Sequence, residues 1–290
     1  MTATILSAAP VVDKIKKELT IKCNDLKKRG VTPSMCVVLV GDNPASLSYI
    51  KNKKRMCEEV GAKFHLEHLP QEITQEHFLS RIQNLNSDPG IHGIIIQLPV
   101  SSVLKELNLA NLIDPSKDID GFHGLNTQKL YSGTTDLSEL LPCTPKGIIN
   151  LLKFYGIEIE GKNIVISGRS LIVGKPLSML LTNLDATVTL THSHTKNLRD
   201  LTKKADILIA AIGKAHYFDK TFFNSDQKTI VIDVGMNTLM GKLTGDVNFE
   251  DVKDVVGGIS PVPGGVGPMT VVSLIENLIS ATEKHIKGNT

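Results

Sequence analysis

Apolar residues follow two different spacings along the chain, and these spacings predict the elements of the fold. Apolar residues three and four positions apart are typical of amphipathic helices, and short apolar or alternating runs are typical of strands. The predicted strands are residues 36–40, 63–69, 91–99, 163–167, 187–191, 206–211 and 229–234. The predicted helices are residues 10–29, 44–60, 74–85, 102–113, 144–155, 174–184 and 197–204, with a last helix starting at Met269 or Thr270. The run 91–99 is apolar on both faces, as expected of a central parallel strand.

Strands that alternate with short helices form βαβ units, so the predicted fold class is α/β with parallel sheets. A chain of 290 residues is too long for one ordinary core and suits two domains. The change of domain is placed near Thr144, which is expected to cap the next helix. We expect residues 1–143 plus 270–290 to form one α/β domain. Residues 144–269 are expected to form a second, Rossmann-type nucleotide-binding domain, with the two parallel sheets flanking a cleft.

The stretch from Gly41 to Lys53 contains the most informative polar residues of the first domain. It follows the strand 36–40, so its helix begins at the carboxyl end of a strand, where open α/β sheets bind ligands. Ser46, Tyr49 and Lys53 are spaced so that they share one stripe of that helix. A hydroxyl, a phenol and an amine on a rigid element can form a polar site.

The alternative interpretation of this stretch is a solvated basic surface. Lys51, Lys54 and Arg55 surround Lys53, and most basic clusters of this kind lie on the exposed face of a helix. Of these four side chains, Lys53 alone shares the stripe with the hydroxyl and the phenol.

Two more polar residues are expected near this stripe. Gln97 ends the strand 91–99 and lies level with the start of the helix 44–60 if the two strands are parallel neighbours. Asp120 lies in the loop 114–124, which contains three aspartates within seven residues. The loop lacks the later glutamate of an EF-hand. We therefore expect Asx turns and one acid that faces a site, rather than a bound metal ion.

A nucleotide-binding signal follows the strand 163–167. Gly168 and Ser170 occupy the first and third positions of the Rossmann fingerprint, where glycine is usual, and Gly174 lies one position later than the last glycine. The N-terminus of the following helix can receive a phosphate on its free N–H groups. A plain tight turn is the alternative, but the βαβ context favours a nucleotide.

The second strand of this domain favours NADP over NAD. An NAD site has an acid roughly 20 residues beyond the glycines, which binds the ribose hydroxyls. Here the strand 187–191 continues into His192 and Ser193, with no acid at its end. Arg169 and Ser193 can bind the 2′-phosphate of NADP, and His192 or Lys196 can assist. Alternatively, His192 is a polar residue that follows the strand and does not contact the cofactor.

Composition excludes several other classes of function. The formal net charge is +2, Trp is absent and aromatic residues make up 4% of the chain, so neither nucleic acid nor a membrane is a predicted partner. Cys23, Cys36, Cys57 and Cys143 form no CxxC pair and are expected to be reduced thiols of a cytosolic protein. No apolar run approaches the ~20 residues of a membrane span, and the N-terminus lacks the features of a signal peptide.

Six stretches of the chain match one known family, in the same order. They are Val40–Ser46 with Tyr49 and Lys53, Gly93–Pro99, Pro115–Phe122, Gly168–Ser170 with Val173–Pro176, Asp233–Gly235 and Pro261–Thr270. Over residues 40–270 the chain thereby resembles the bifunctional methylenetetrahydrofolate dehydrogenase/methenyltetrahydrofolate cyclohydrolase family. The first and last stretches are the most specific. Met236 departs from the smaller aliphatic residue that is usual beside the cofactor.

The resemblance implies an enzyme that oxidises methylenetetrahydrofolate to methenyltetrahydrofolate with NADP and then hydrolyses the product to formyltetrahydrofolate. It implies that Tyr49 stacks on the aminobenzoyl ring and that Asp120 accepts paired hydrogen bonds from the pterin. Lys53 is implied as the general base or proton relay of the hydrolysis, held by Gln97. A homodimer is also implied.

The same resemblance assigns the remaining site residues. The further substrate-binding residues are Ser46, Ile96, Leu98, Pro263, Gly264 and Gly267. The cofactor-binding residues are Gly168, Arg169, Ser170, Gly174, Ser193 and Met236. Three alternatives stay open: a folate dehydrogenase without the hydrolase step, an NADP-dependent reductase for another small substrate, and a non-enzymatic NADP-binding protein.

Overall fold

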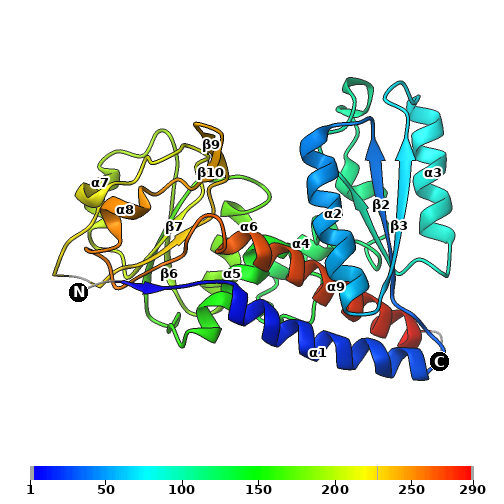
Figure 1. Ribbon diagram of the computed structural model, residues 1–290, viewed down its shortest axis with the longest axis horizontal. Helices are drawn as coiled ribbons and strands as arrows, with labels where there is room; N and C mark the ends of the chain where they lie inside the picture. Colours follow the sequence, from blue (N-terminus) through cyan, green and yellow to red (C-terminus); the bar gives the residue numbers. More distant parts are fainter. Residues whose placement is uncertain (1–2, 227, 289–290) are drawn as a thin grey trace. The chain divides into compact units, whose positions relative to one another are not determined.

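The computed structural model describes residues 3–226 and 228–288, which fold into two compact units (Figure 1). The six-stranded unit comprises the chain up to Asp13, residues 130–135 and residues 144–270. The three-stranded unit comprises residues 14–129, 136–143 and the chain from Val271 onward. Helices α1 (Ala9–Lys28) and α9 (Val266–Gly288) each contribute residues to both units. Among the described residues, no helix is both long and apolar enough to cross a membrane.

The larger sheet, as far as the described residues show it, has neighbouring strands that all run parallel. Its strand order is β1 (Thr4–Ile5), β11 (Gly258–Ile259), β8 (Ile230–Asp233), β7 (Ile207–Ala210), β5 (Asn163–Ser167) and β6 (Thr187–Thr191). The same unit contains α6 (Gly174–Asn183), α7 (Leu198–Thr202), α8 (Phe249–Val252), most of α5 (Cys143–Phe154), and the hairpin β9 (Asn237–Leu239) and β10 (Lys242–Thr244). Apolar residues of the central strands pack against Phe218 and Phe222 in its core. The predicted α/β class of this domain is confirmed.

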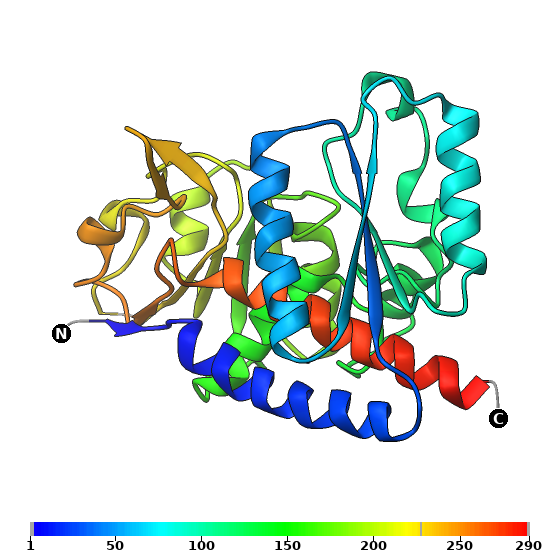
Figure 2. The same ribbon diagram turned by 45° about the vertical axis from the view of Figure 1, so that its right-hand side comes forward.

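The smaller sheet is also parallel, with the strand order β3 (Lys63–Leu69), β2 (Ser34–Val40) and β4 (Gly93–Ile96). Helices α2 (Pro44–Glu59) and α3 (Gln75–Ser87) lie on opposite faces of it in both views (Figures 1 and 2). The side chains of Phe78 and Ile82 on α3 pack against Val38 and Ile94 in a buried apolar cluster. A fourth helix, α4 (Gly124–Tyr131), follows the loop 114–123.

The strand predicted to be central, 91–99, is shorter than expected and is not central. β4 covers Gly93–Ile96 and, among the named strands, pairs with β2 alone, so β2 is the middle strand. The other edge of β4 meets an isolated parallel bridge between Ile94 and Asp118. A Cβ atom added to Gly93 would lie 2.6 Å from Ile119 and 3.0 Å from Leu278. The strand is therefore apolar on both faces because a loop and α9 bury it.

The helix predicted over residues 102–113 is wrong. The chain forms two short 3₁₀ helices there, Ser102–Leu104 and Leu109–Leu112. Leu104 is buried in the cluster beside α3, and Leu107, Leu109 and Leu112 pack partly against it. The leucines thus pack into the core from an irregular segment. Their helix-like spacing therefore does not require one continuous helix.

Two segments belong to a different unit from the one that the predicted domains gave them. The chain up to Asp13 joins the six-stranded unit because β1 extends its sheet, with the Leu6 N–H donating to the Ile259 carbonyl at 2.9 Å. Residues 130–135 join it because the Asn183 amide donates to the carbonyls of Leu130 and Thr134. β1 and β11 have two residues each, which is too short for a periodic pattern.

Two helices begin earlier than predicted. α5 starts at Cys143, so Thr144 lies within the helix instead of capping it, and its hydroxyl lies 3.0 Å from that of Thr270. α9 starts at Val266, and Pro268 occupies its first turn, where the missing N–H of proline costs no hydrogen bond.

Candidate functional site

The site in the three-stranded unit starts at the N-terminus of α2. The side-chain oxygen of Asn43 accepts hydrogen bonds from the N–H groups of Ala45 and Ser46, at 3.0 and 3.1 Å, and Pro44 takes the first helical position. Asn43 therefore satisfies two of the helix's free donors and sets where the helix begins. This fixes which side chains of α2 face the end of β4.

Two side chains of α2 contact the chain where it leaves β4. The Lys53 amine donates to Gln97 Oε1 at 3.0 Å, and the Ser46 hydroxyl donates to the Leu98 carbonyl at 3.2 Å. The Gln97 amide nitrogen donates to the same carbonyl at 2.9 Å, so the amide is held at both ends. The Gln97 backbone N–H donates to Val38, which continues the β2–β4 ladder to this point. The predicted meeting of the α2 stripe with Gln97 is present in the geometry.

The surface beside this contact combines an aromatic and an apolar side chain. Tyr49 is 41% exposed and Leu98 is 57% exposed, although both are large and partly apolar. Ile96, the last residue of β4, is buried. Exposed aromatic and apolar groups next to half-buried polar side chains are typical of a ligand site.

Asp120 lies close enough to Lys53 to interact with it electrostatically. Burial raises the pKa of the Asp120 carboxyl, the Lys53 amine lowers it, and the neighbouring Asp118 carboxylate raises it. The loop is held from α9, where the Asn277 amide donates to the carbonyls of Ile119 and Leu141 at 2.9 and 2.8 Å. Asp120 is therefore a carboxyl on a fixed loop that interacts electrostatically with Lys53.

The other two aspartates of the loop stabilise its turns. Asp114 accepts from the Ser116 N–H, and Asp118 accepts from the N–H groups of Gly121 and His123 and from the Asn126 amide. These are the Asx-type bonds that we expected. No group of three or more possible metal ligands occurs among the described residues.

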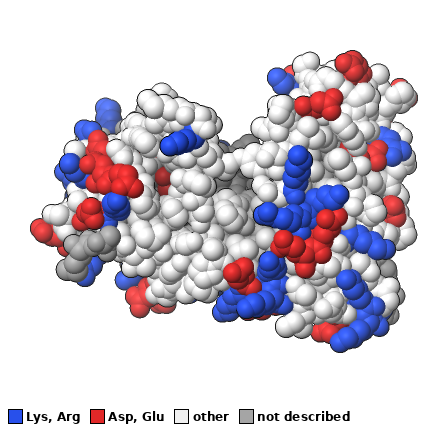
Figure 3. Space-filling model, in the orientation of Figure 1, with Lys and Arg blue, Asp and Glu red and all other residues white. Residues whose placement is uncertain are grey.

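The neighbouring basic residues of α2 differ from Lys53. Figure 3 shows basic side chains gathered over α2 with acidic ones beside them, and Lys54 and Arg55 form ion pairs with Glu58 and Glu59 at 3.8 Å. Lys51, Lys54 and Arg55 are exposed, whereas Lys53 is half-buried. The basic-surface interpretation therefore describes the neighbours of Lys53 and not Lys53 itself.

The second site is a cavity of about 320 Å³ at the carboxyl ends of β5, β6 and β7. Its lining residues include Gly168, Arg169, Ser170, His192 and Ser193. The open α/β sheet places ligands at this edge. The predicted NADP residues from two separate strand ends are thus brought together around one cavity.

The two glycines of the fingerprint make the turn above β5 possible. Gly168 has φ +121°, and a Cβ atom there would lie 2.0 Å from the Ala211 carbonyl oxygen. A Cβ atom on Gly174, the first residue of α6, would lie 1.9 Å from the Gly168 carbonyl oxygen. Neither position has room for a side chain, so both glycines are required for the close packing of this turn. Ser170 stabilises the same turn, because its hydroxyl oxygen accepts a hydrogen bond from the Val173 N–H.

Several predicted residues lie outside these two groups. Met236, 48% exposed, follows β8 and is not part of the cavity lining. Lys196 is not part of that lining either. Pro263, Gly264 and Gly267 lie in the six-stranded unit, where Gly264 has φ +102° and its carbonyl accepts from the Ala8 N–H.

A buried aspartate that the sequence does not single out, Asp246, shapes the cavity wall. Asp246 Oδ2 accepts from the N–H groups of Ile212 and Gly213, and its Oδ1 accepts from the Lys214 N–H and the Asn237 amide. Ile212 and Lys214 line the cavity. Asp246 lies 32 to 34 residues after these three backbone N–H groups, so local spacing does not indicate the contact.

Asp233, at the end of β8, supports Asp246 in turn. Its carboxylate accepts from the N–H groups of Gly235, Asp246 and Val247 at 2.9 to 3.0 Å. Burial raises the pKa of Asp233 to about 6, against the opposing effect of these three donors. The close packing needs glycine at Gly245, where a Cβ atom would lie 1.8 Å from the Asp233 carboxylate.

Comparison with known proteins identifies both units. The family profile described as the tetrahydrofolate dehydrogenase/cyclohydrolase catalytic domain matches residues 6–120, and the profile of its NAD(P)-binding domain matches residues 142–286. The bifunctional protein FolD of Bacillus subtilis is 45% identical over 290 residues, covering 99% of this chain and all of that protein.

Solved structures agree with this assignment. The bifunctional FolD enzyme of Campylobacter jejuni is 43% identical, with a TM-score of 0.93 over 97% of this chain and 99% of that chain. The Trypanosoma brucei enzyme, solved with NADP and an inhibitor, is 30% identical, with a TM-score of 0.92 over 99% of both chains. The chain therefore belongs to the bifunctional FolD family of methylenetetrahydrofolate dehydrogenase/cyclohydrolase enzymes.

Proposed function

We propose that this enzyme oxidises methylenetetrahydrofolate to methenyltetrahydrofolate with NADP as the cofactor and hydrolyses the product to formyltetrahydrofolate, with Lys53 as general base or proton relay. The single observation that carries the Lys53 assignment is its hydrogen bond to Gln97 at the end of β4, beside the Asp120 carboxyl. The folate-binding assignments of Tyr49, Ser46, Ile96, Leu98, Pro263, Gly264 and Gly267 are part of the same proposal, as are the cofactor-binding assignments of Ser193 and Met236.

The residues at the β5 turn fit a dinucleotide. Gly168 and Gly174 let the turn after β5 pack closely against the Ala211 carbonyl and the start of α6, and the Gly174 N–H at the first position of α6 can donate to a phosphate. Arg169 lines the same cavity and can pair with a 2′-phosphate, a contact that NAD does not offer. NADP, when bound, supplies the hydride acceptor for the first reaction, and the protein contributes its position.

In the hydrolysis, the residues around Lys53 move a proton. Gln97 Oε1 accepts a hydrogen bond from one N–H of Lys53. This contact holds the amine in place, so that its other hydrogen-bonding positions are available to the substrate and to water. A neutral Lys53 amine can then remove a proton from the water that attacks the methenyl carbon. Asp120 accepts hydrogen bonds from the amino-pyrimidine edge of the folate, which compensates the burial of its carboxylate.

Exchange of Lys53 for Met tests the proposal. Loss of a positioned general base typically slows a reaction by ~10²–10⁴-fold, so Lys53→Met should lose the hydrolysis by that factor while the Kd of NADP stays within about twofold. The matched control is Lys54→Met, which removes an exposed lysine one residue away. Stopped-flow absorbance separates formation of reduced NADP from decay of the methenyl species.

The alternative of a dehydrogenase without the hydrolase step gives a different result. In that case neither variant would change the decay of added methenyltetrahydrofolate relative to buffer. Equal hydrolysis rates in Lys53→Met and the wild type would remove Lys53 from the mechanism.

A further inference from the structure

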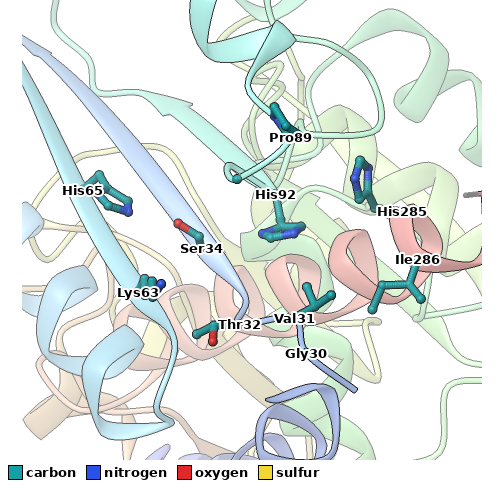
Figure 4. A pocket seen from close by; sticks show the side chains of 11 residues that line it. Gly30, Val31, Thr32, Ser34, Lys63, His65, Pro89, His92, His285 and Ile286 are labelled. Atoms are coloured by element: carbon teal, nitrogen blue, oxygen red, sulfur yellow. The ribbon is translucent and has the colours of Figure 1, made fainter. Parts of the chain in front are cut away.

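A second cavity lies in the three-stranded unit at the amino ends of its strands (Figure 4). Its volume is about 570 Å³. It is bounded by the starts of β2 and β3, the turn before β4 and the last part of α9. β2 has seven residues, each rising roughly 3.3 Å, so roughly 20 Å separates this cavity from the Lys53–Gln97 contact at the other ends of the strands.

The floor of the cavity is a polar row at the first rung of the sheet. Ser34 pairs with Lys63 in the β2–β3 ladder, and the His92 N–H donates to the Ser34 carbonyl at 2.8 Å. Paired residues of neighbouring strands point to the same face. On β2 the next positions of that face, Cys36, Val38 and Val40, belong to the apolar cluster, whereas the β3 partners of the first two, His65 and Glu67, are polar.

Two side chains of this row are buried without a hydrogen-bond partner. Ser34 is 1% exposed and His92 is 6% exposed, and neither Ser34 Oγ nor His92 Nδ1 has a partner within the described structure. A buried polar atom without a partner is energetically unfavourable. Two such atoms beside one cavity indicate that a bound group completes their hydrogen bonds.

The electrostatic environment of the row favours a negative group. Lys63 forms no ion pair with the described residues, and none of the lining residues is Asp or Glu. Burial, together with His285 and Lys117, lowers the pKa of His92 to about 4, while Asp88 acts in the opposite direction. A negative ligand would compensate the positive neighbours of His92 and would favour its protonated form.

We propose that this cavity binds a small organic anion, with its carboxylate or phosphate against Lys63, Ser34 and His92. A bare inorganic ion would fill only part of a cavity of this size, which falls in the range of small-molecule sites. Val31, Pro89 and Ile286 provide apolar walls for the rest of the ligand (Figure 4). The site is separate from folate and dinucleotide binding.

Calorimetric titration with phenyl phosphate and, separately, with benzoate tests this site and distinguishes the two anionic groups. Both titrations use the full chain saturated with NADP, so that the probe cannot bind at the β5 turn. We expect at least one probe to bind with a Kd of about 1 mM or tighter, and Lys63→Met to weaken that binding by at least tenfold, the effect of about 1.4 kcal/mol. The control, Lys105→Met, removes an exposed lysine of the same unit and should leave the Kd unchanged.

Histidine NMR gives an independent readout. Saturation with the probe should raise the pKa of His92 by at least about one unit, because the negative charge of the probe stabilises the protonated imidazole. A shift of one unit corresponds to 1.36 kcal/mol. The signal is assigned by its loss in His92→Gln. Absence of binding by both probes would overturn the proposal, since water alone would then serve Ser34 and His92. Equal binding by Lys63→Met and the wild type would overturn it as well.

Discussion

Replacement of Asp246 by Asn tests whether this buried carboxylate positions the wall of the dinucleotide cavity. Each carboxylate oxygen accepts two hydrogen bonds, Oδ2 from Ile212 and Gly213 and Oδ1 from Lys214 and Asn237. Asparagine keeps one oxygen and places an NH₂ group against the other two donors. Two buried donors therefore lose their acceptor, at about 1–3 kcal/mol each, so the variant should lose about 2–6 kcal/mol.

Two measurements follow from this loss. Because Ile212 and Lys214 line the cavity, Asp246→Asn should raise the Kd of NADP by at least about tenfold in calorimetric titration. Thermal unfolding should shift down by several degrees, at roughly 2–4 °C per kcal/mol for a unit of this size. The control Asp254→Asn changes an exposed aspartate of the same unit. An Asp246→Asn variant with both the Kd of NADP and the unfolding temperature of the wild type would refute the positioning role.

Two further predictions concern the same unit. Arg169→Ala should weaken NADP by at least about tenfold more than NAD, because it removes a charge-assisted contact to the 2′-phosphate; an equal loss for both cofactors in parallel titrations would show that Arg169 does not read this group. Asp233 should titrate near its raised pKa of about 6, which ¹³C NMR of its carboxyl measures directly. Because its folded pKa lies above the unfolded value of about 3.9, the folded state binds more protons between these values, and the Asp233 contribution to stability falls as pH rises from about 4 to 6, by about 3 kcal/mol. A carboxyl midpoint at pH 4 or below would contradict the effect of burial.

The sequence predicted those parts of the fold in which one strand or helix carries its own pattern. β2, β3, β5 and β6 agree with the predicted strands to within two residues, since each is a run of apolar or alternating residues. The sequence could not predict the two-residue strands β1 and β11, which exist only because each finds a neighbouring strand to pair with.

The same limit applies to the site residues. The sequence could predict that Lys53 and Gln97 lie close together, because each belongs to an element with a recognisable pattern. Lys53 lies on a polar stripe of a helix, and Gln97 lies at the end of an apolar strand. Asp246 could not, because its role depends on three backbone N–H groups that arrive from a loop more than thirty residues earlier in the chain. Local spacing carries no information about such a contact until the sheet brings β7 and β8 together.

In both units the proposed site residues lie just after the carboxyl end of a strand. β4 ends at Ile96 and is followed by Gln97, and β5 ends at Ser167 and is followed by Gly168. Because side chains alternate between the faces of a strand, a strand longer by one residue would turn Gln97 away from Lys53. The position of Gln97 is thus set by the register of β4 against β2, where Ile96 pairs with Val38 and the Gln97 N–H donates to the Val38 carbonyl. An inserted residue within β4 should therefore abolish the Lys53–Gln97 contact even if the apolar core refolds around it.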